Sequence, residues 1–307
     1  MRTWVRSQLR RTYERLLERE ISGVPTHVAV IQDGNRRYAD ANGDETTDGH
    51  RQGAKTTENL LFWCDDLGIE ELTLYAFSTE NFNRPEEERE ALFDLICEKL
   101  TEFADADRIH ENEVRIRAIG QLDMLPPRVQ ETINYAHERT KDYDRLRLNI
   151  ALAYGGRAEL LEASRDVARA VQAGSLSPED ITVETLEERI YDGPARDVDL
   201  IIRTGGDERT SNFLPWHANG NEAAVFFCTP YWPEFSKIDF LRSIRTYEAR
   251  EASWRRTRAQ RAVALVKSFG GTELDEAKRI ITRFRDHLPN GELEGVEADD
   301  LRETQIE

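Results

Sequence analysis

The sequence of 307 residues is poor in lysine, and negative charge dominates it: six of its 42 basic residues are lysines, and its formal net charge is -17. A strongly acidic chain does not suit nucleic acid, because a surface that binds nucleic acid must be basic to displace the counterions of the phosphates. We therefore expect no nucleic-acid partner. An acidic, lysine-poor surface is typical of proteins from salt-rich cytoplasms, where screening reduces the repulsion between like charges.

Cysteines are also few, and long hydrophobic runs are absent. Cys64, Cys97 and Cys228 lie far apart in apolar stretches without a CxxC pair, which favours buried, reduced thiols over disulfides or a metal site. The N-terminus lacks the apolar core of a signal peptide, and no run of about 18 apolar residues occurs that could span a membrane. We expect a soluble, cytoplasmic protein.

The two ends of the chain have opposite charge. Residues 2–21 carry the pattern of an amphipathic helix, with six arginines against three glutamates. Such a helix packs against the domain or a dimer partner, or it contacts a membrane surface through Trp4 and its arginines, and the sequence leaves both interpretations open. From about residue 288, seven acidic residues and one arginine predict a solvated tail.

Between these ends, short apolar runs alternate with amphipathic stretches. The runs predict six strands, at residues 27–32, 71–77, 113–119, 146–152, 198–203 and 222–228. Helical patterns occur at 50–67, 86–109, 127–143, 157–173 and 183–191, and a long helix follows over 237–267. Strands that alternate with helices indicate an α/β domain with a six-stranded, mostly parallel sheet that helices cover on both faces.

Polar and charged side chains gather where these predicted strands end. Ligands of open parallel sheets bind beyond the carboxyl ends of the strands, so we expect these groups to converge. The first strand ends in Asp33-Gly34-Asn35-Arg36-Arg37, and the second in FSTENFNRP, with Ser78, Glu80, Asn81 and Arg84. The fourth ends in AYGGRAEL, the fifth in RTGGDERTSNF with Arg203, Arg209 and Ser211, and Glu222 opens the sixth.

The chemistry of these groups points to phosphate. Clustered guanidinium groups repel one another unless an anion lies among them, and their planar forks match phosphate oxygens. Two carboxylates, Asp33 and Glu222, suit the same site where a hard cation joins carboxylate to phosphate. Mg²⁺ binds in this way, through one or two carboxylates and the phosphates of a substrate. The residues therefore predict a Mg²⁺-assisted site for one or two diphosphates.

Other phosphate sites fit less well. The sequence has no GxxxxGK[ST] loop and no GxGxxG after the first strand, which excludes the common nucleotide-binding loops. A phosphatase with Asp33 as nucleophile stays as an alternative, although Gly34-Asn35 supplies no second carboxylate as acid. Four aromatic residues among the polar groups suit a substrate with an anionic head and an apolar body: Tyr38, Phe77, Phe82 and Phe213.

These motifs resemble those of the cis-prenyltransferases, the family of undecaprenyl and dehydrodolichyl diphosphate synthases. The resemblance covers roughly residues 25–240 and rests on HVAVIQDGNRRYA, Gly49-His50, LTLYAFSTENFNRP, LNIALAYGGR, DLIIRTGGDERTSNF and WPEF. It implies a homodimer with an apolar tunnel in each subunit and Mg²⁺ as cofactor. It also implies that isopentenyl diphosphate elongates an allylic diphosphate, with a new cis double bond in each cycle, to a long-chain polyprenyl diphosphate for glycosyl carrier lipids.

The resemblance also implies roles for individual residues. Asp33 is the essential acid and shares Mg²⁺ with Glu222, and Asn81 is a second catalytic residue. Gly34, Asn35 and Arg37 bind the allylic diphosphate, and Arg203, Arg209 and Ser211 bind isopentenyl diphosphate. The remaining substrate-binding residues are Arg36, Tyr38, His50, Ser78, Glu80, Phe82 and Arg84.

Several features of the chain qualify this resemblance. The DGNRR form is more typical of archaeal and eukaryotic members, which favours geranylgeranyl diphosphate as the primer, with farnesyl diphosphate as the second choice. Thr46 stands where bacterial members have a pyrophosphate-binding arginine, and Arg36 or Arg51 is left to compensate. We expect residues 1–24 to form the basic helix, 25–272 the catalytic domain with its long C-terminal helix, and 273–307 a short helix and acidic tail. A non-catalytic partner subunit and a polyprenyl diphosphate phosphatase are the alternatives.

Overall fold

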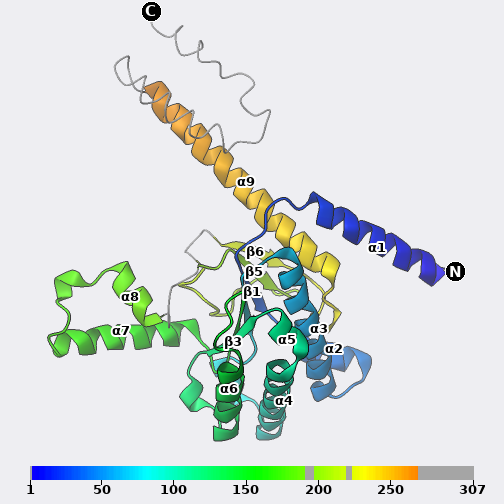
Figure 1. Cartoon of the computed structure of the whole chain (residues 1–307), viewed down its shortest axis with the longest axis horizontal. Coiled ribbons are helices and arrows are strands. Elements are labelled where there is room, and N and C mark those ends of the chain that lie inside the picture. Colours follow the sequence, from blue (N-terminus) through cyan, green and yellow to red (C-terminus); the bar gives the residue numbers. More distant parts are fainter. Residues whose placement is uncertain (1, 191–196, 219–222, 269–307) are drawn as a thin grey trace, which may run out of the picture. The chain divides into compact units, whose positions relative to one another are not determined.

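The computed structural model describes residues 2–190, 197–218 and 223–268. Within these residues, one six-stranded sheet has the order β3-β4-β2-β1-β5-β6, and every pair of neighbouring strands is parallel. The strands are β1 (His27–Ile31), β2 (Glu71–Tyr75), β3 (Val114–Ile119), β4 (Leu146–Ala151), β5 (Leu200–Arg203) and β6 (Ala224–Phe227). The predicted six-stranded parallel sheet is confirmed (Figure 1).

Helices follow most of the strands along the chain. In the described residues they are α1 (Arg2–Glu20), α2 (Asn35–Asn42), α3 (Thr46–Leu67), α4 (Glu86–Asp105), α5 (Asp107–Glu111), α6 (Pro127–Thr140), α7 (Gly156–Gln172), α8 (Val183–Ile190) and α9 (Lys237–Ser268). A 3₁₀ turn at Thr79–Asn83 follows β2. The chain divides into two compact units, Met1–Tyr247 and Glu248–Glu307, and the sheet belongs to the first.

Two helices differ from the sequence prediction. The pattern predicts no helix after the first strand, yet α2 forms there between Gly34 and Gly43, whose φ angles are 101° and 73°. Only glycine adopts such positive angles readily, so these two residues let the chain enter and leave a short helix sharply. The single helix predicted over 86–109 is two helices, α4 and α5, because Ala106 has an extended backbone (φ -69°, ψ 125°).

The larger apolar core lies on one face of the sheet. Successive side chains of a strand point to opposite faces, so alternate residues of β1, β2 and β4 enter this core. It includes Val28, Val30, Leu72, Leu74, Leu148 and Ile150, and it is completed by Leu60 of α3, Phe93 of α4 and Val129 of α6. A smaller cluster lies on the other face, around Ile31, Tyr154 and Phe213. The site is built at the end of the sheet that separates these two clusters.

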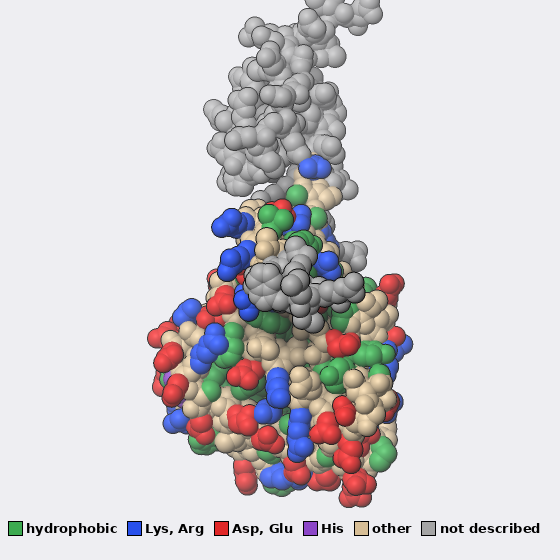
Figure 2. Space-filling model, turned by 90° about the vertical axis from the view of Figure 1, so that its right-hand side faces the viewer, with side chains coloured by type: hydrophobic (Ala, Val, Ile, Leu, Met, Phe, Trp, Pro, Cys, Tyr) green, Lys and Arg blue, Asp and Glu red, His purple; other side chains and the backbone are tan. Residues whose placement is uncertain are grey.

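The surface is ionic, and the ends of the first unit are held by ion pairs. Figure 2 shows acidic side chains spread over one face of the molecule, with basic side chains between them. Glu18 and Glu20 of α1 contact Lys237 and Arg245 of α9, each at 2.8 Å, so α1 packs against the start of α9. Among the described residues, no helix combines the length and the apolar character needed to cross a lipid bilayer.

The cysteines differ in part from the prediction. All three are free thiols. Cys64 is buried, as predicted, and burial raises its pKa. Cys97 and Cys228 are only half-buried, because each lies at the edge of the core rather than within it. The prediction of full burial is therefore wrong for these two residues.

Candidate functional site

Asp33 follows β1, and its carboxylate contacts two arginines from separate parts of the chain. Arg203 ends β5, beside Ile31 in the strand register, and donates from Nη2 to Asp33 Oδ2 at 2.7 Å. Arg37 of α2 donates from Nη2 to Oδ1 at 3.0 Å. Burial raises the pKa of Asp33, but the hydrogen bonds from Arg203 and Arg37 outweigh it, so the pKa lies below its ordinary value of 3.8. The carboxylate is therefore ionised at neutral pH.

The backbone of Asp33 is fixed by the segments that follow β5 and β6. Its carbonyl accepts a hydrogen bond from Thr204 Oγ1 at 2.7 Å and another from the Trp232 backbone at 3.0 Å. Arg37 Nη1 donates to the Gly205 carbonyl at 2.8 Å. Gly205 has a φ of 84°, and a Cβ there would lie 2.6 Å from Arg37 Nη2. Thr204 and Gly205 were not predicted as site residues: they lie within the RTGGDERTSNF motif, but their contacts with Asp33 and Arg37 depend on how β5 pairs with β1.

Arg203 organises the loop after β5. Only 3% of the residue is exposed, and its Nη1 donates to Ser211 Oγ at 2.6 Å and to the Arg209 carbonyl at 2.5 Å. Its Nη2 also contacts Asp207 Oδ2 at 3.1 Å, and Asp207 contacts Arg209 Nη2 at the same distance. One buried guanidinium thus shapes the loop that presents the exposed Arg209. Asp207 is a further contact that the sequence analysis missed.

Most of the predicted site residues line one cavity of about 610 Å³. The residues that it brings together are Asp33, Asn35, Arg36, His50, Ser78, Glu80, Asn81, Arg84, Arg203, Arg209 and Ser211. Gly34, Arg37, Tyr38 and Phe82 are not among its lining residues. Glu222, predicted as a metal ligand, lies outside the described residues.

The predicted residues outside the cavity have other contacts. Arg37 acts on Asp33, as described, and its guanidinium lies 5.5 Å from the centre of the Tyr231 ring. A Cβ at Gly34 would lie 2.7 Å from that ring, so this position has no room for a side chain. Phe82 packs edge-on against Phe77, with ring centres 5.1 Å apart. Phe77, like Phe213, is 1% exposed, so both aromatic rings belong to the core rather than to the cavity.

The loop after β2 forms a second wall of the cavity. Asn81 Oδ1 accepts a hydrogen bond from the Ser78 backbone at 2.8 Å, which closes the 3₁₀ turn on itself. Arg84 pairs with Glu88 at the start of α4. Burial, together with the nearby charges of Arg84 and Arg36, lowers the pKa of His50 from 6.5 to about 4. His50 is thus a neutral side chain among cations.

A large part of the cavity lining is apolar. This part comes from one face of α4 and from residues of β2 and β4: Leu74, Leu92, Leu95, Ile96, Leu100, Phe103 and Ile150. Lys99 also lines the cavity, and its ammonium group contacts Glu98 at 3.6 Å and Glu102. Lys99 was not predicted as a site residue, although its spacing from Ile96 and Phe103 places the three on one helix face. A cavity with a charged mouth and a large apolar part fits a ligand with an anionic head and an apolar body.

The helices α2 and α3 meet at two glycines. A Cβ at Gly49 would lie 2.3 Å from the Asn35 carbonyl oxygen, and one at Gly53 would lie 2.2 Å from Asn35 Oδ1. Trp232 Nε1 donates to the Gly53 carbonyl at 2.8 Å, which holds the same turn of α3 from the other side. The amide of Asn35 is therefore locked between α3 and Trp232 where the cavity begins.

Arg36 and Arg51, the two arginines considered as substitutes for an arginine at Thr46, lie in different cavities. Thr46 and Arg51 line a separate cavity of about 160 Å³ between α3 and α4, and Arg51 pairs with Asp48 at 3.8 Å. Arg36 lines the larger cavity beside Asp33. Arg36, and not Arg51, is therefore among the residues that line the larger cavity.

A metal ion is compatible with this donor set only together with a ligand. Among the described residues, no three His, Cys, Asp or Glu side chains are grouped closely enough to hold a metal. Asp33 supplies one ionised carboxylate at the cavity mouth, with arginines placed for phosphate around it. Mg²⁺ often binds through one or two carboxylates plus substrate phosphates, so the residues present fit that ion when a diphosphate is bound.

The chain is similar to known prenyltransferases. Residues 31–255 match the model of a prenyltransferase family described as undecaprenyl diphosphate synthase. The chain is 66% identical to the tritrans,polycis-undecaprenyl-diphosphate synthase (geranylgeranyl-diphosphate specific) of Haloarcula marismortui over 94% of both chains. It is 64% identical to the protein of the same name from Halobacterium salinarum, over 97% of this chain and 98% of that one.

A solved structure has the same fold. The crystal structure of lavandulyl diphosphate synthase from Lavandula x intermedia, in complex with dimethylallyl diphosphate, superposes with a TM-score of 0.68 at 30% sequence identity. The match covers 73% of this chain and 95% of the lavender enzyme. The chain belongs to the undecaprenyl diphosphate synthase family of prenyltransferases.

Proposed function

We propose that this protein condenses isopentenyl diphosphate with an allylic diphosphate in repeated cycles, forming a cis double bond each time, and releases a long-chain polyprenyl diphosphate. One observation carries the proposal: Asp33 lies between Arg37 and Arg203 at the charged mouth of a cavity whose lining is in large part apolar. Such a cavity matches a substrate that keeps its diphosphate at the mouth while its hydrocarbon tail grows inward. The high identity to two named synthases supports it.

The residues suggest two diphosphate positions. Arg36 and the first turn of α2 face the cavity on one side, where backbone N–H groups at a helix N-terminus favour an anion. We assign the allylic diphosphate to this side. Arg209 and Ser211, held by Arg203, lie on the other side and suit isopentenyl diphosphate.

The chemical step needs a pyrophosphate to leave. Negative charge grows on the leaving group as the allylic bond breaks, and fixed donors around it lower the barrier. Arg36, Arg37 and Asn35 are the donors that we place there, with neutral His50 beside them. Asn81 is placed on the loop that covers the reacting carbons. Ser78, Glu80 and Arg84 complete the proposed binding surface of the cavity, and we propose that Gly34, Tyr38 and Phe82, which do not line it, support that surface from outside.

We propose Mg²⁺ as the cofactor, held by Asp33 together with the diphosphate and, by resemblance, by Glu222. When bound, the ion neutralises charge on the departing pyrophosphate. Asp33 is suited to this role because its depressed pKa keeps it ionised in the presence of two guanidiniums.

The finer properties follow from the relatives. We propose geranylgeranyl diphosphate as the primer, because the two halophile relatives carry that specificity in their names, and an undecaprenyl chain as the product. We further propose a cytoplasmic homodimer from a salt-rich cell. Residues Arg11, Arg15 and Arg19 of α1 are exposed, which supports a peripheral contact with an anionic membrane that receives the product.

The test is direct elongation. Purified protein is incubated with Mg²⁺, labelled isopentenyl diphosphate and either geranylgeranyl or farnesyl diphosphate, and products are identified by mass spectrometry. We expect long polyprenyl diphosphates, more from geranylgeranyl diphosphate, and none after chelation of Mg²⁺. No elongation with either primer would refute the function. Release of inorganic phosphate instead of pyrophosphate would favour the phosphatase.

A further inference from the structure

The segment after β4 joins the two loops that form the walls of the cavity mouth. Tyr154 is bridged to Ser78 in the manner of a parallel strand, and its carbonyl accepts a hydrogen bond from the Thr79 backbone at 3.0 Å. Its own N–H donates to the Phe77 carbonyl at 3.1 Å. The backbone of Tyr154 therefore carries the start of the turn that presents Ser78 and Asn81.

The side chain of Tyr154 points to the other loop. Its ring is fully buried and meets Phe213 edge-on, with ring centres 5.9 Å apart. Phe213 in turn stacks on Tyr75, at 4.5 Å and an interplanar angle of 7°. Phe213 lies two residues after Ser211, so the Tyr154 ring supports the loop that Arg203 and Ser211 share.

That second loop is itself unusual in its backbone. Three residues of this loop have positive φ angles, which residues other than glycine rarely adopt: Ser211 (48°), Asn212 (60°) and Leu214 (47°). Asn212 secures the loop to the start of α7: its carbonyl accepts from the Gly156 N–H, and its Oδ1 accepts from the Arg157 N–H, both at 2.9 Å. Such a strained segment keeps its shape only where its neighbours fix it.

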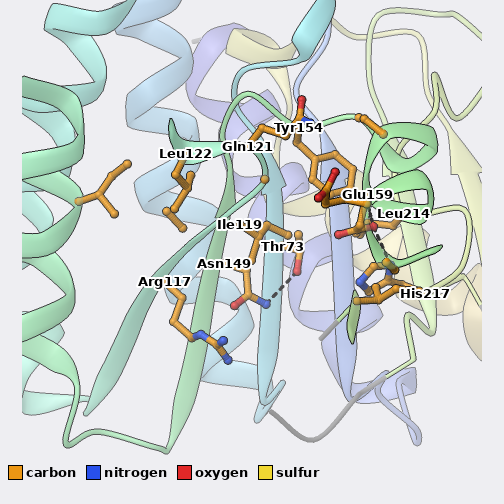
Figure 3. Close-up of a pocket in the computed structure, with 18 of the residues that line it drawn as sticks. Thr73, Arg117, Ile119, Gln121, Leu122, Asn149, Tyr154, Glu159, Leu214 and His217 are labelled. Atoms are coloured by element: carbon orange, nitrogen blue, oxygen red, sulfur yellow. Dashed lines mark hydrogen bonds and ion pairs between the residues drawn. The ribbon is translucent and has the colours of Figure 1, made fainter. Parts of the chain in front are cut away.

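Among the described residues, the hydroxyl of Tyr154 contacts the side chain of Glu159 and the backbone of Leu214. It donates to Glu159 Oε2 at 2.6 Å, one turn into α7. Figure 3 shows Tyr154, Glu159 and His217 together in a second cavity of about 690 Å³, on the face of the sheet that bears Thr73 and Asn149. The residues assigned to diphosphate binding line the first cavity and not this one: Asp33, Arg203 and Arg209. The bond between Tyr154 and Glu159 is thus made behind the site rather than in it.

We propose that Tyr154 is a positioning residue for the elongation reaction, and that Glu159 is the acceptor that fixes it. Through its backbone Tyr154 sets the loop of Ser78 and Asn81, and through its ring it sets the loop of Arg209 and Ser211. It thereby fixes the spacing between the two substrates without touching either one. The inference rests on the proposed function, because it concerns the geometry of that reaction.

If Tyr154 is a positioning residue, its loss should change the rate of the reaction while the protein stays folded. A displacement of about 1 Å between reacting groups can cost on the order of 10²-fold in rate. Tyr154→Phe keeps the ring and the backbone bonds but removes the hydroxyl, whose bond to Glu159 is proposed to hold both in place. We expect kcat to fall at least tenfold and the KM for isopentenyl diphosphate to rise, while the protein stays folded.

The experiment compares five variants with the wild type by steady-state elongation and thermal unfolding. Glu159→Leu, which removes the acceptor, should reproduce Tyr154→Phe, and the double variant should be no worse than either single one. Glu159→Gln keeps an oxygen that accepts the bond and should recover most of the rate. Tyr143→Phe is the control, because Tyr143 loses a comparable bond, 2.9 Å from its hydroxyl to His110 Nδ1, outside both cavities.

The outcomes separate the two proposals. If the wild type elongates and Tyr154→Phe has the kcat and KM of Tyr143→Phe, the positioning role is wrong and the proposed function stands. Additive losses in the double variant would also overturn it. If the wild type itself does not elongate any primer, the proposed function fails first.

Discussion

Arg203 and Asp33 lie 170 residues apart in the sequence, yet Arg203 Nη2 is 2.7 Å from Asp33 Oδ2. The contact forms because β5 pairs with β1, so both strands deliver their last residues to the same edge of the sheet. Only 4% of the Arg203 side chain is exposed, and a buried guanidinium needs this charge beside it. The same pair thus serves the fold and the site.

The charge of Asp33 is the first feature to test. Asp33→Asn keeps the shape of the side chain and removes its charge, so we expect elongation to fall on the order of 10²-fold or more, as when a charge-stabilising group is lost. The measurement is incorporation of labelled isopentenyl diphosphate. Asp207→Asn is the matched control: Asp207 also contacts Arg203, at 3.1 Å, but does not line the cavity, and its loss should be smaller. Equal losses would contradict a direct role for Asp33.

The geometry of Arg203 can be tested separately from its charge. Arg203→Lys keeps the charge, but a single ammonium cannot contact Asp33, Ser211 and the Arg209 carbonyl as the planar fork does. We expect at least a tenfold rise in the KM for isopentenyl diphosphate and a lower unfolding temperature. Arg209→Lys, at an exposed position, should unfold like the wild type. An unchanged KM in Arg203→Lys would show that charge alone is sufficient.

The apolar part of the cavity should limit the length of the product. Ile96 lines the cavity on α4, and Ile96→Trp reduces the space into which the tail grows. Mass spectrometry of the polyprenyl products should show a shift to shorter chains with little change in the first condensation. Leu161→Trp adds the same ring to a residue of α7 that is 52% exposed, and its products should match those of the wild type. An unshifted distribution in Ile96→Trp would place the growing tail elsewhere.

The free energy of unfolding should fall in acid because His217 is buried in its neutral form. Burial, with the charge of His27 adding to it, lowers the pKa of His217 from 6.5 to about 4. A folded-state pKa below the unfolded value gives stability that is complete above pH 6.5 and is lost as the pH falls toward 4. At about 1.4 kcal/mol per pKa unit, the loss is about 3 kcal/mol. His217→Gln should flatten the fall of the unfolding temperature between pH 6.5 and 4, and an unaltered fall would exclude His217 as its cause.

Glu159 should affect the pH dependence of stability in the opposite direction to His217. Burial raises its pKa from 4.5 to about 7, so its contribution to stability is complete below pH 4.5 and is lost as the pH rises through 7. Between pH 4.5 and 6.5 its 3.7 Å contact with His217 therefore joins two largely neutral groups. The unfolding temperature of Glu159→Gln should depend less on pH from 4.5 to 7 than that of the wild type. The same dependence in both proteins would contradict a raised pKa.

The sheet and much of the site could be predicted from the sequence because both depend on local patterns. Apolar runs followed by Asp33, Ser78 and Arg203 mark strand ends directly, and parallel strands bring their ends together. Contacts that depend on register could not be predicted. That Thr204 would hold Asp33, or that Phe213 would stack on Tyr75 in the core, follows only from how the chain packs.

Helix α2 and the break between α4 and α5 were not predicted from the sequence, for different physical reasons. α2 is short and rich in charge, and the Gly34 and Gly43 that bound it are equally typical of a loop. Ala106 breaks the helix predicted over 86–109 although alanine is the best helix former, so tertiary packing overrides local preference there. Lys99 was missed because a charged residue on an apolar helix face is usually assigned to solvent.

The contact of Asn35 with Gly53 has a consequence for how such an enzyme can change. The turn of α3 at Gly53 carries no side chain and receives the amide of Asn35 from α2, so under the proposed function the helix assigned to the primer packs tightly on the helix beside the proposed tail space. Moving α3 to widen the proposed tail space would therefore also displace Asn35 and the start of α2. New product lengths are therefore more accessible, in evolution or in the laboratory, through the side chains of α4 on the opposite wall.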